Sequence, residues 1–370
     1  MIFRKNQGKI IAAALAGTIL LLGMTSCSMQ KNAENTGTVA LENAPVETGT
    51  IENQITESQI TGNRNEAEEP KSETVAEMPV SRETEDAVGQ EQKVTNPEPA
   101  ASGKETEPAT SEPIEYGNLQ QITLQPDWEY ADHSKINSGA AVMYMAAEDS
   151  GRKNLIIGVN AGHGTSGGSK VKTLCHPDGS AKTTGGSTAA GATEATAVSG
   201  GMTFQDGTPE SAVTLKMAQI LRDKLLSAGF DVLMLRDGED VQLDNVARTV
   251  ICNNVADCHI SLHWDSGDGK DYDKGCFYIS VPEGLKNMEP VASHWQQHDA
   301  LGADLVEGLR SRGATIYGKG HMSIDLTQTS YSTIPSVDME LGNGYSDHSD
   351  ATLDTLAEGL VQGIQTYFGK

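Results

Sequence analysis

Four side chains that could carry out hydrolysis are spread over the second half of the sequence. His163 lies between two glycines, Glu210 follows a proline, His263 closes a run of alternating polarity, and Glu340 precedes Leu-Gly. Two histidines and one carboxylate make a catalytic zinc set, because they leave one coordination position open for water. A carboxylate outside that set can take the proton of the water and pass it to a departing nitrogen. The four residues are therefore candidates for a zinc hydrolase centre.

On spacing alone, each candidate keeps a plainer interpretation. His163 could be a turn residue, and Glu340 could pair with an arginine. His263 has a rival, because period-two alternation in the run 258–263 puts His259 on the same face of a strand. Four residues of strand span roughly 13 Å, so both histidines cannot bind one ion. We favour His263 because it ends the strand, and we expect His259 to be buried and hydrogen-bonded.

Residues so far apart in sequence meet only if a sheet brings its strand ends together. Strand-like and helix-like patterns alternate from residue 154 onward, which predicts a mostly parallel, mixed, twisted α/β sheet of about six strands with helices on both faces. Ligands in such sheets bind beyond the carboxyl ends of the strands, where His163, His263 and Glu340 fall. The expected strands are 155–159, 230–235, 258–263, 276–281, 314–317 and 336–341, and the expected helices are 210–228, 243–251, 292–309 and 353–364.

The first 27 residues have the pattern of an export signal. Three basic residues precede an apolar run over 10–22, which is short for a membrane-spanning helix of roughly 20 residues. Residues 24–27, Met-Thr-Ser-Cys, resemble the lipobox of bacterial lipoproteins. This resemblance implies that Cys27 carries a lipid and that the protein is exported and anchored to the cell membrane, facing the cell wall. The alternative is an ordinary secretory signal with an incidental cysteine.

Composition divides the remainder of the chain. Residues 28–117 contain scattered prolines and many glutamates, and Tyr116 is their only aromatic residue, so they cannot bury enough apolar surface to offset the entropy of ordering. They are predicted to be a disordered acidic linker. Residues 118–153 are predicted to be an arm that packs on the catalytic domain, which covers 154–370. The net charge of -24 and the lack of a basic cluster exclude nucleic acid as a partner.

Four cysteines follow Cys27, and an oxidising exterior would permit bridges between them. Their spacing selects no pairing. Cys252 and Cys258 fall in an apolar helix and an apolar strand, and we predict that they are unpaired core thiols.

Four motifs in order resemble those of the zinc-dependent N-acetylmuramoyl-L-alanine amidases of the amidase-3 family. They are Ile157–Gly164 with Asn-Ala-Gly-His-Gly, the helix-start Glu210, the segment 248–263 ending in Ser-Leu-His, and Pro335–Gly342 with Glu-Leu-Gly. The resemblance implies that His163, Glu210 and His263 bind one zinc ion per chain and that Glu340 is the catalytic glutamate.

The same resemblance implies the reaction and the partner. The enzyme would cleave the amide between the lactyl group of N-acetylmuramic acid and L-alanine of the stem peptide, with peptidoglycan as the partner. The sequence does not determine the oligomeric state, and we expect a monomer. Two alternatives remain: another zinc peptidase of cell-wall peptides, and a non-catalytic wall-binding or activator homologue. The intact ligand set and Glu340 argue against the second.

The chain departs from the family pattern at three places, one of which is Asn343, where the family commonly has an aromatic residue after Glu-Leu-Gly. Asn160 stands where the family usually has Asp, a residue expected to support the turn or a zinc ligand from behind. Arg248 and His176 are further candidates for such support or for substrate contact. The segment 165–207 is far longer than the usual link, and could be a lid, a substrate-selecting loop or a spacer. Its Cys175 or His176 could fill the open zinc position.

Overall fold

The structure, a computed structural model, describes residues 119–266 and 271–370. The predicted signal peptide, Cys27 and the predicted linker 28–117 lie outside the described residues. Their lipidation and disorder therefore stay predictions. Within the described ranges, none of the helices has both the length and the apolar character that a membrane span requires.

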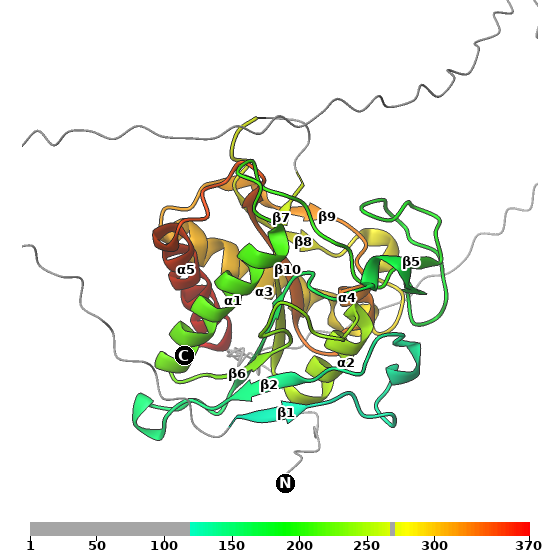
Figure 1. The fold of residues 1–370 in the computed structure, drawn as a ribbon, viewed down its shortest axis with the longest axis horizontal. Coiled ribbons are helices and arrows are strands. Elements are labelled where there is room, and N and C mark those ends of the chain that lie inside the picture. The colour runs from blue at the N-terminus through cyan, green and yellow to red at the C-terminus, as the bar shows by residue number, and fades with distance from the viewer. Residues whose placement is uncertain (1–118, 267–270) are drawn as a thin grey trace, which may run out of the picture. The chain divides into compact units, whose positions relative to one another are not determined.

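A single large sheet organises the described residues (Figure 1). Its four central strands, β6, β3, β7 and β10, run parallel to one another, whereas β1, β2 and β8 each pair antiparallel with a neighbour. This confirms the predicted mixed, mostly parallel sheet. The eight strands in spatial order are β1 (Gln120–Ile122), β2 (Ala141–Tyr144), β6 (Asp231–Met234), β3 (Ile156–Ala161), β7 (Cys258–Asp265), β10 (Ser336–Asn343), β8 (Cys276–Ser280) and β9 (Ile316–Ser323).

The first two strands were not predicted. All six expected strands form, but the arm before residue 154 adds β1 and β2 at the edge of the sheet, where Tyr144 pairs with Val232 of β6. The arm thereby joins the sheet itself. A small two-stranded sheet, β4 (Lys172–Leu174) with β5 (Glu194–Thr196), lies within the long segment 165–207.

Helices cover both faces of the sheet, as the alternation predicts. The helices are α1 (Glu210–Ser227), α2 (Asn245–Val255), α3 (Val291–Ser311), α4 (Thr327–Tyr331) and α5 (Asp350–Phe368), with short 3-10 helices at Ala131–His133, Glu148–Ser150, Gly168–Lys170 and Glu283–Leu285. The side chain of Asp244 accepts a hydrogen bond from Ala247 N and caps the start of α2, and Ser349 caps α5 in the same way.

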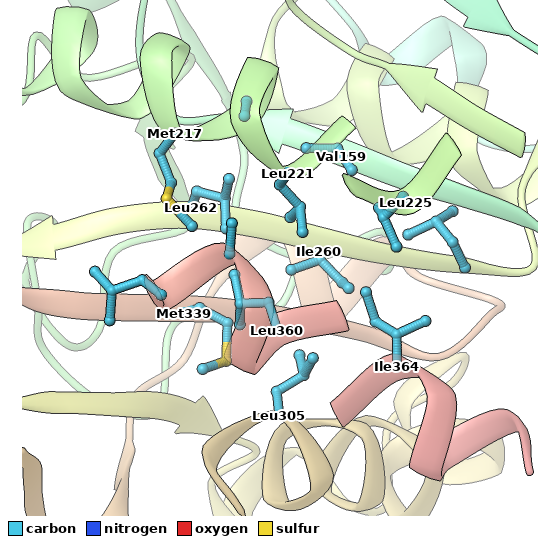
Figure 2. Close-up of a cluster of buried hydrophobic side chains, with 14 of the residues drawn as sticks. Val159, Met217, Leu221, Leu225, Ile260, Leu262, Leu305, Met339, Leu360 and Ile364 are labelled. Carbon is cyan, nitrogen blue, oxygen red and sulfur yellow. The ribbon is translucent and has the colours of Figure 1, made fainter. Parts of the chain in front are cut away.

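The larger core lies on one face. Every second residue of β3, β7 and β10, such as Val159, Ile260 and Met339, packs with α1, α3 and α5 (Figure 2). Burying one such aliphatic side chain stabilises the fold by about 1.5–3 kcal/mol. The opposite face of β6 packs on α2 through Leu233 and Ile251.

The parallel register places the candidate residues. β3, β7 and β10 are neighbours that run in one direction, so their carboxyl ends lie at the same edge of the sheet. Asn160 pairs with Ser261, and His263 pairs with Glu340. Paired residues point to the same face, so these polar side chains gather on the face opposite the larger core.

Candidate metal centre

His163, Glu210 and His263 converge from three different elements. They come from the turn after β3, the first residue of α1 and the end of β7. His163 Nε2 lies 2.8 Å from Glu210 Oε1, and His263 Nδ1 lies 3.2 Å from the same oxygen. The two histidine nitrogens are 3.1 Å apart. In the described part of the chain, this is the one group of three or more His, Cys, Asp or Glu side chains close enough to hold a metal ion.

The donor set and its spacing fit zinc. Zinc binds histidine nitrogen and carboxylate oxygen at about 2.0–2.2 Å in a tetrahedron, which puts neighbouring ligand atoms roughly 3.3 Å apart. The three donor atoms here are 2.8–3.2 Å apart. Two histidines and one carboxylate also leave a fourth position for water or substrate.

The glycine before His163, Gly162, is required for steric reasons. A Cβ at Gly162 would lie 2.3 Å from the imidazole of His263, so only glycine lets the turn approach the second histidine this closely. His163 itself has φ 65, in the left-handed region that non-glycine residues rarely adopt. The Gly-His-Gly sequence therefore encodes a strained turn that presents an imidazole.

Two buried arginines hold this turn from behind. Arg248 donates to the carbonyl oxygens of His163 at 2.7 Å and Ala161 at 3.1 Å, and to Asn160 Oδ1 at 3.0 Å. Arg236 donates to Gly162 O at 2.9 Å. Burial, together with the mutual repulsion of the two cations at Arg248, lowers the pKa of Arg248 to about 9, and burial lowers the pKa of Arg236 to about 10. Both stay charged at neutral pH.

These contacts separate the expected roles of Asn160 and Arg248. Asn160 also donates to Ser261 Oγ at 3.0 Å, so it ties β3 to β7 and touches the turn through Arg248. Arg248 is fully buried behind the turn and does not line the cavity described below, so the structure gives it no direct contact with substrate. Arg236 was missed, although an arginine directly after a buried strand was a readable signal.

Glu210 is held in its ionised form. Burial alone would raise the pKa of its carboxyl, but hydrogen bonds with His163 and His263 outweigh burial and lower the pKa well below its usual range. The backbone N–H groups of Trp264 and Met202 also donate to its two oxygens, at 3.0 and 2.8 Å. For His263, burial lowers the pKa, but Asp338 and then Glu210 raise it to about 10, so a metal ion must displace a proton there.

Glu340 lies beside the three residues, as the register requires. Its Oε2 is buried and has no hydrogen-bond partner within the described residues, and no arginine there is within ion-pair distance of it. Burial first, and then the neighbouring Asp338, raise the pKa of Glu340 well above its usual range. Asp338 was not singled out from the sequence, yet its Oδ2 lies 3.8 Å from His263 Nε2. Its position two residues before Glu340 on the same face was the available signal.

His259 is buried as expected, but the expected hydrogen bond is wrong. Neither ring nitrogen has a partner in the described ranges. Burial, with Arg248 and His298 nearby, lowers the pKa of His259 to about 3. The ring therefore stays neutral and buried, and His263 alone of the two histidines joins the metal group.

Cys175 and His176, which could have filled the open zinc position, are not part of the metal group. His176 is fully buried and its Nε2 lies 2.9 Å from Asp325 Oδ1. Cys175 is likewise buried and free. Cys252 and Cys258 are also free and buried, which confirms the prediction of unpaired core thiols. Cys276 is free and buried as well.

A cavity of about 630 Å³ opens over the centre. His163, Glu210, His263, Asp338 and Glu340 all line it. The lining also includes residues of the long segment between His163 and Glu210, of the loop before α4 and of α4 itself; among them are Lys182, Ser187, Thr196, Ser199, Met202, Ile324 and Gln328. A substrate that enters the cavity meets both the metal group and this segment.

Comparison with known structures gave several similar folds. The apo N-acetylmuramyl-L-alanine amidase Ami1 of Mycobacterium abscessus is 20% identical, over 58% of this chain and 99% of that one, with a TM-score of 0.49. The amidase AmiC2 of Nostoc punctiforme is 18% identical over 59% and 99% of the two chains, with a TM-score of 0.43. The CwlD amidase of Clostridioides difficile, solved with the GerS lipoprotein, is 18% identical over 58% and 99%, with a TM-score of 0.42.

A search of curated protein sequences found no match. The family model Amidase_3, described as N-acetylmuramoyl-L-alanine amidase, matches residues 157–365. That range is more than half of the chain and contains His163, Glu210, His263 and Glu340. The chain therefore belongs to the Amidase_3 family of N-acetylmuramoyl-L-alanine amidases and is a peptidoglycan amidase.

Proposed function

We propose that this amidase is zinc-dependent, with one ion held by His163, Glu210 and His263 and with Glu340 as the general base. The observation that carries the proposal is the register of β7 and β10, which puts the unpartnered Oε2 of Glu340 beside the ligand His263. The substrate is the amide between the lactyl group of N-acetylmuramic acid and L-alanine of the stem peptide. When bound, zinc supplies Lewis-acid chemistry: it lowers the pKa of water and polarises a carbonyl.

Glu340 transfers a proton from the attacking water to the departing nitrogen. Its carboxylate accepts a proton from water as the water oxygen forms a bond to the carbonyl carbon. The carbon–nitrogen bond then breaks, and Glu340 returns the proton to the departing nitrogen. The products are the lactyl carboxylic acid on the sugar and a peptide with a free L-alanine amino group. The raised pKa of Glu340 suits a group that must keep a proton between these two steps.

Asp338 and the cavity assist in two ways. Asp338 adds negative charge beside Glu340, which stabilises the protonated form of the glutamate. The cavity is large enough for one sugar ring with its attached dipeptide, because pockets for ligands of that size occupy about 300–1,000 Å³. The reacting groups and residues of the segment 165–207 therefore line the same cavity.

We further propose that the protein is exported and tethered to the membrane through a lipid on Cys27, so that the domain faces the cell wall. The supporting pattern is the basic, apolar and Met-Thr-Ser-Cys order of the first 27 residues. Mass spectrometry of the mature protein tests this. A diacylated or triacylated N-terminal Cys27 supports it, and a mature chain that begins elsewhere contradicts it.

The reaction is tested by digesting purified muropeptides and identifying the products by mass. The proposal expects free stem peptides that begin with L-alanine, together with the peptide-free saccharide of each muropeptide. Products with the sugar–peptide amide intact but shortened peptides would mean a peptidase. Unchanged muropeptides with zinc-loaded protein would mean a non-catalytic homologue.

A further inference from the structure

Near its C-terminal end, the long segment 165–207 contacts two of the proposed metal-binding side chains. His163 Nδ1 lies 3.0 Å from the carbonyl oxygen of Ser199 and 3.1 Å from its Oγ. The backbone N–H of Met202 donates to Glu210 Oε2 at 2.8 Å, and Glu210 N donates back to Met202 O at 3.0 Å. Ser199 and Met202, near the end of this segment, thus contact two of the three ligands.

These contacts determine which atoms of His163 and Glu210 are free to bind a metal ion. A carbonyl oxygen can only accept, so the contact with Ser199 requires a hydrogen on His163 Nδ1 and leaves the lone pair on Nε2. In the same way, Met202 occupies one oxygen of Glu210 and leaves Oε1 facing the two histidines. Partners of this kind orient metal ligands, and their loss typically costs 10–100-fold in metal affinity.

Gly201 shows how tightly the segment is fitted. A Cβ at this position would lie 2.8 Å from His163 Cδ2 and 3.0 Å from Glu210 Oε2. Its φ of 82 is also in the left-handed region. The backbone therefore passes so close to both ligands that no side chain fits between.

The middle of the segment is anchored by a buried aspartate outside the metal group. Asp325, in the loop between β9 and α4, is fully buried. Its Oδ1 lies 2.9 Å from His176 Nε2, and its Oδ2 accepts from Thr183 N at 2.7 Å. Its own N–H donates to Thr184 Oγ1 at 2.8 Å. A loop that served only as a spacer would not require a buried carboxylate with three contacts to it.

We propose that the segment 165–207 is an integral part of the metal centre: Ser199, Gly201 and Met202 hold His163 and Glu210 in their metal-binding orientation, and the Asp325 anchor keeps them there. The segment is a metal-retaining clamp that also lines the cavity. Ser199, Gly201 and Met202 are positioning residues, because they act through the ligands. This inference rests on the proposed zinc site.

Three glycine variants of the full-length chain test the clamp. Gly201→Ala pushes a methyl group into both ligands. Gly200→Ala changes the neighbouring residue, where a Cβ meets nothing within 4 Å. Gly207→Ala carries the same left-handed strain, with φ 89, but again without a contact. Zinc affinity is measured by competition with a chromogenic chelator, and folding by thermal melting in excess chelator.

The clamp predicts that Gly201→Ala weakens zinc binding by about 10–100-fold. Gly200→Ala and Gly207→Ala should bind zinc as the wild type does, and Gly201→Ala should melt without metal at the temperature of Gly207→Ala. Wild-type affinity in Gly201→Ala, or equal loss in Gly207→Ala, overturns the proposal. If the wild type itself binds no zinc, the proposed function fails instead, so the two failures are distinguishable.

Asp325→Ala gives a second test that leaves the ligands and their direct partners unchanged. It should speed amide hydrogen exchange at Ser199–Met202 and weaken zinc binding, while exchange in the strands β3 and β7 stays slow. Unchanged exchange and unchanged zinc affinity would contradict the anchor. This variant also decides the matter if Gly201→Ala does not fold.

Discussion

Glu340 and His263 are direct partners in the parallel pairing of β7 and β10. Neighbouring strands lie about 4.8 Å apart, so a residue on one strand has its register partner as its nearest side chain on the next. Two residues 77 positions apart in the sequence, one a proposed metal ligand and the other a proposed base, thereby keep a constant separation set by backbone hydrogen bonds.

Glu340→Gln should abolish most hydrolysis and leave zinc in place. Glutamine keeps the size of the side chain but cannot accept and return a proton, a function worth about 10²–10⁴-fold in rate. Turnover of muropeptides and zinc per chain are measured on the same sample. The matched control is Asp265→Asn, because Asp265 lines the same cavity but pairs with Lys274. Turnover of Glu340→Gln equal to that of the control would remove Glu340 as the base.

His263→Ala should lose the metal ion. Two ligands remain after this change, and they hold zinc far more weakly than three. Zinc per chain is measured after dialysis against metal-free buffer. His321→Ala, at an exposed histidine of β9, should keep one zinc. If His263→Ala retains as much zinc as His321→Ala, the assignment of the third ligand is wrong.

Arg248→Lys should destabilise the fold strongly even though the charge is conserved. Arg248 donates to five buried acceptors around the His163 turn, at Leu243, Asn160, Ala161, His163 and Thr165. A lysine ammonium cannot reach them all, and breaking such a buried network costs about 3–5 kcal/mol. Urea unfolding of metal-free protein measures the loss.

The control for Arg248→Lys is Arg312→Lys. Arg312 pairs with Glu358 on the surface, where substitutions change stability by about 0.5 kcal/mol or less. Equal stability of the two variants would mean that Arg248 does not hold the turn.

Acid should destabilise the domain through two buried histidines. Burial lowers the pKa of His259 and of His298 to about 3, against about 6.5 in the unfolded chain. Between these values the unfolded chain binds protons that the folded chain does not, so the free energy of unfolding falls as the pH drops below about 6.5. Each histidine contributes a slope of up to about 1.4 kcal/mol per pH unit.

His298→Gln should therefore reduce the slope of stability against pH by up to one proton between pH 6 and pH 4, measured by urea unfolding in chelator. Glutamine can still accept from Ser336 N, as His298 Nδ1 does at 3.0 Å. A wild-type slope in His298→Gln would show that His298 titrates in the folded protein.

Periodicity was enough to predict the six main strands and four of the helices. Their apolar residues recur with the period of the element, as Ile157 and Val159 do in β3. β1 has no such pattern, since Gln120 and Gln121 are exposed, and α4 is five residues long. Both depend on neighbours distant in sequence.

The site was predictable only in part for a similar reason. His163, Glu210, His263 and Glu340 fall at strand ends and a helix start, which a sequence shows directly. The contact of Ser199 with His163 and that of His176 with Asp325 join small or polar residues across 36 and 149 positions, without any periodic signal. The hydrogen bond expected for His259 was wrong, because the neighbours that surround it offer no matching partner within the described residues.

The central claim is that one zinc ion on His163, Glu210 and His263 is required for cleavage of the sugar–peptide amide. Full-length protein is stripped with a chelator and titrated with zinc, while free L-alanine amino termini released from muropeptides are counted. The account predicts no release without metal and full release at one equivalent of zinc. Full release from protein with less than about a tenth of an equivalent of any metal would contradict it, because the ion supplies the reactive water at neutral pH.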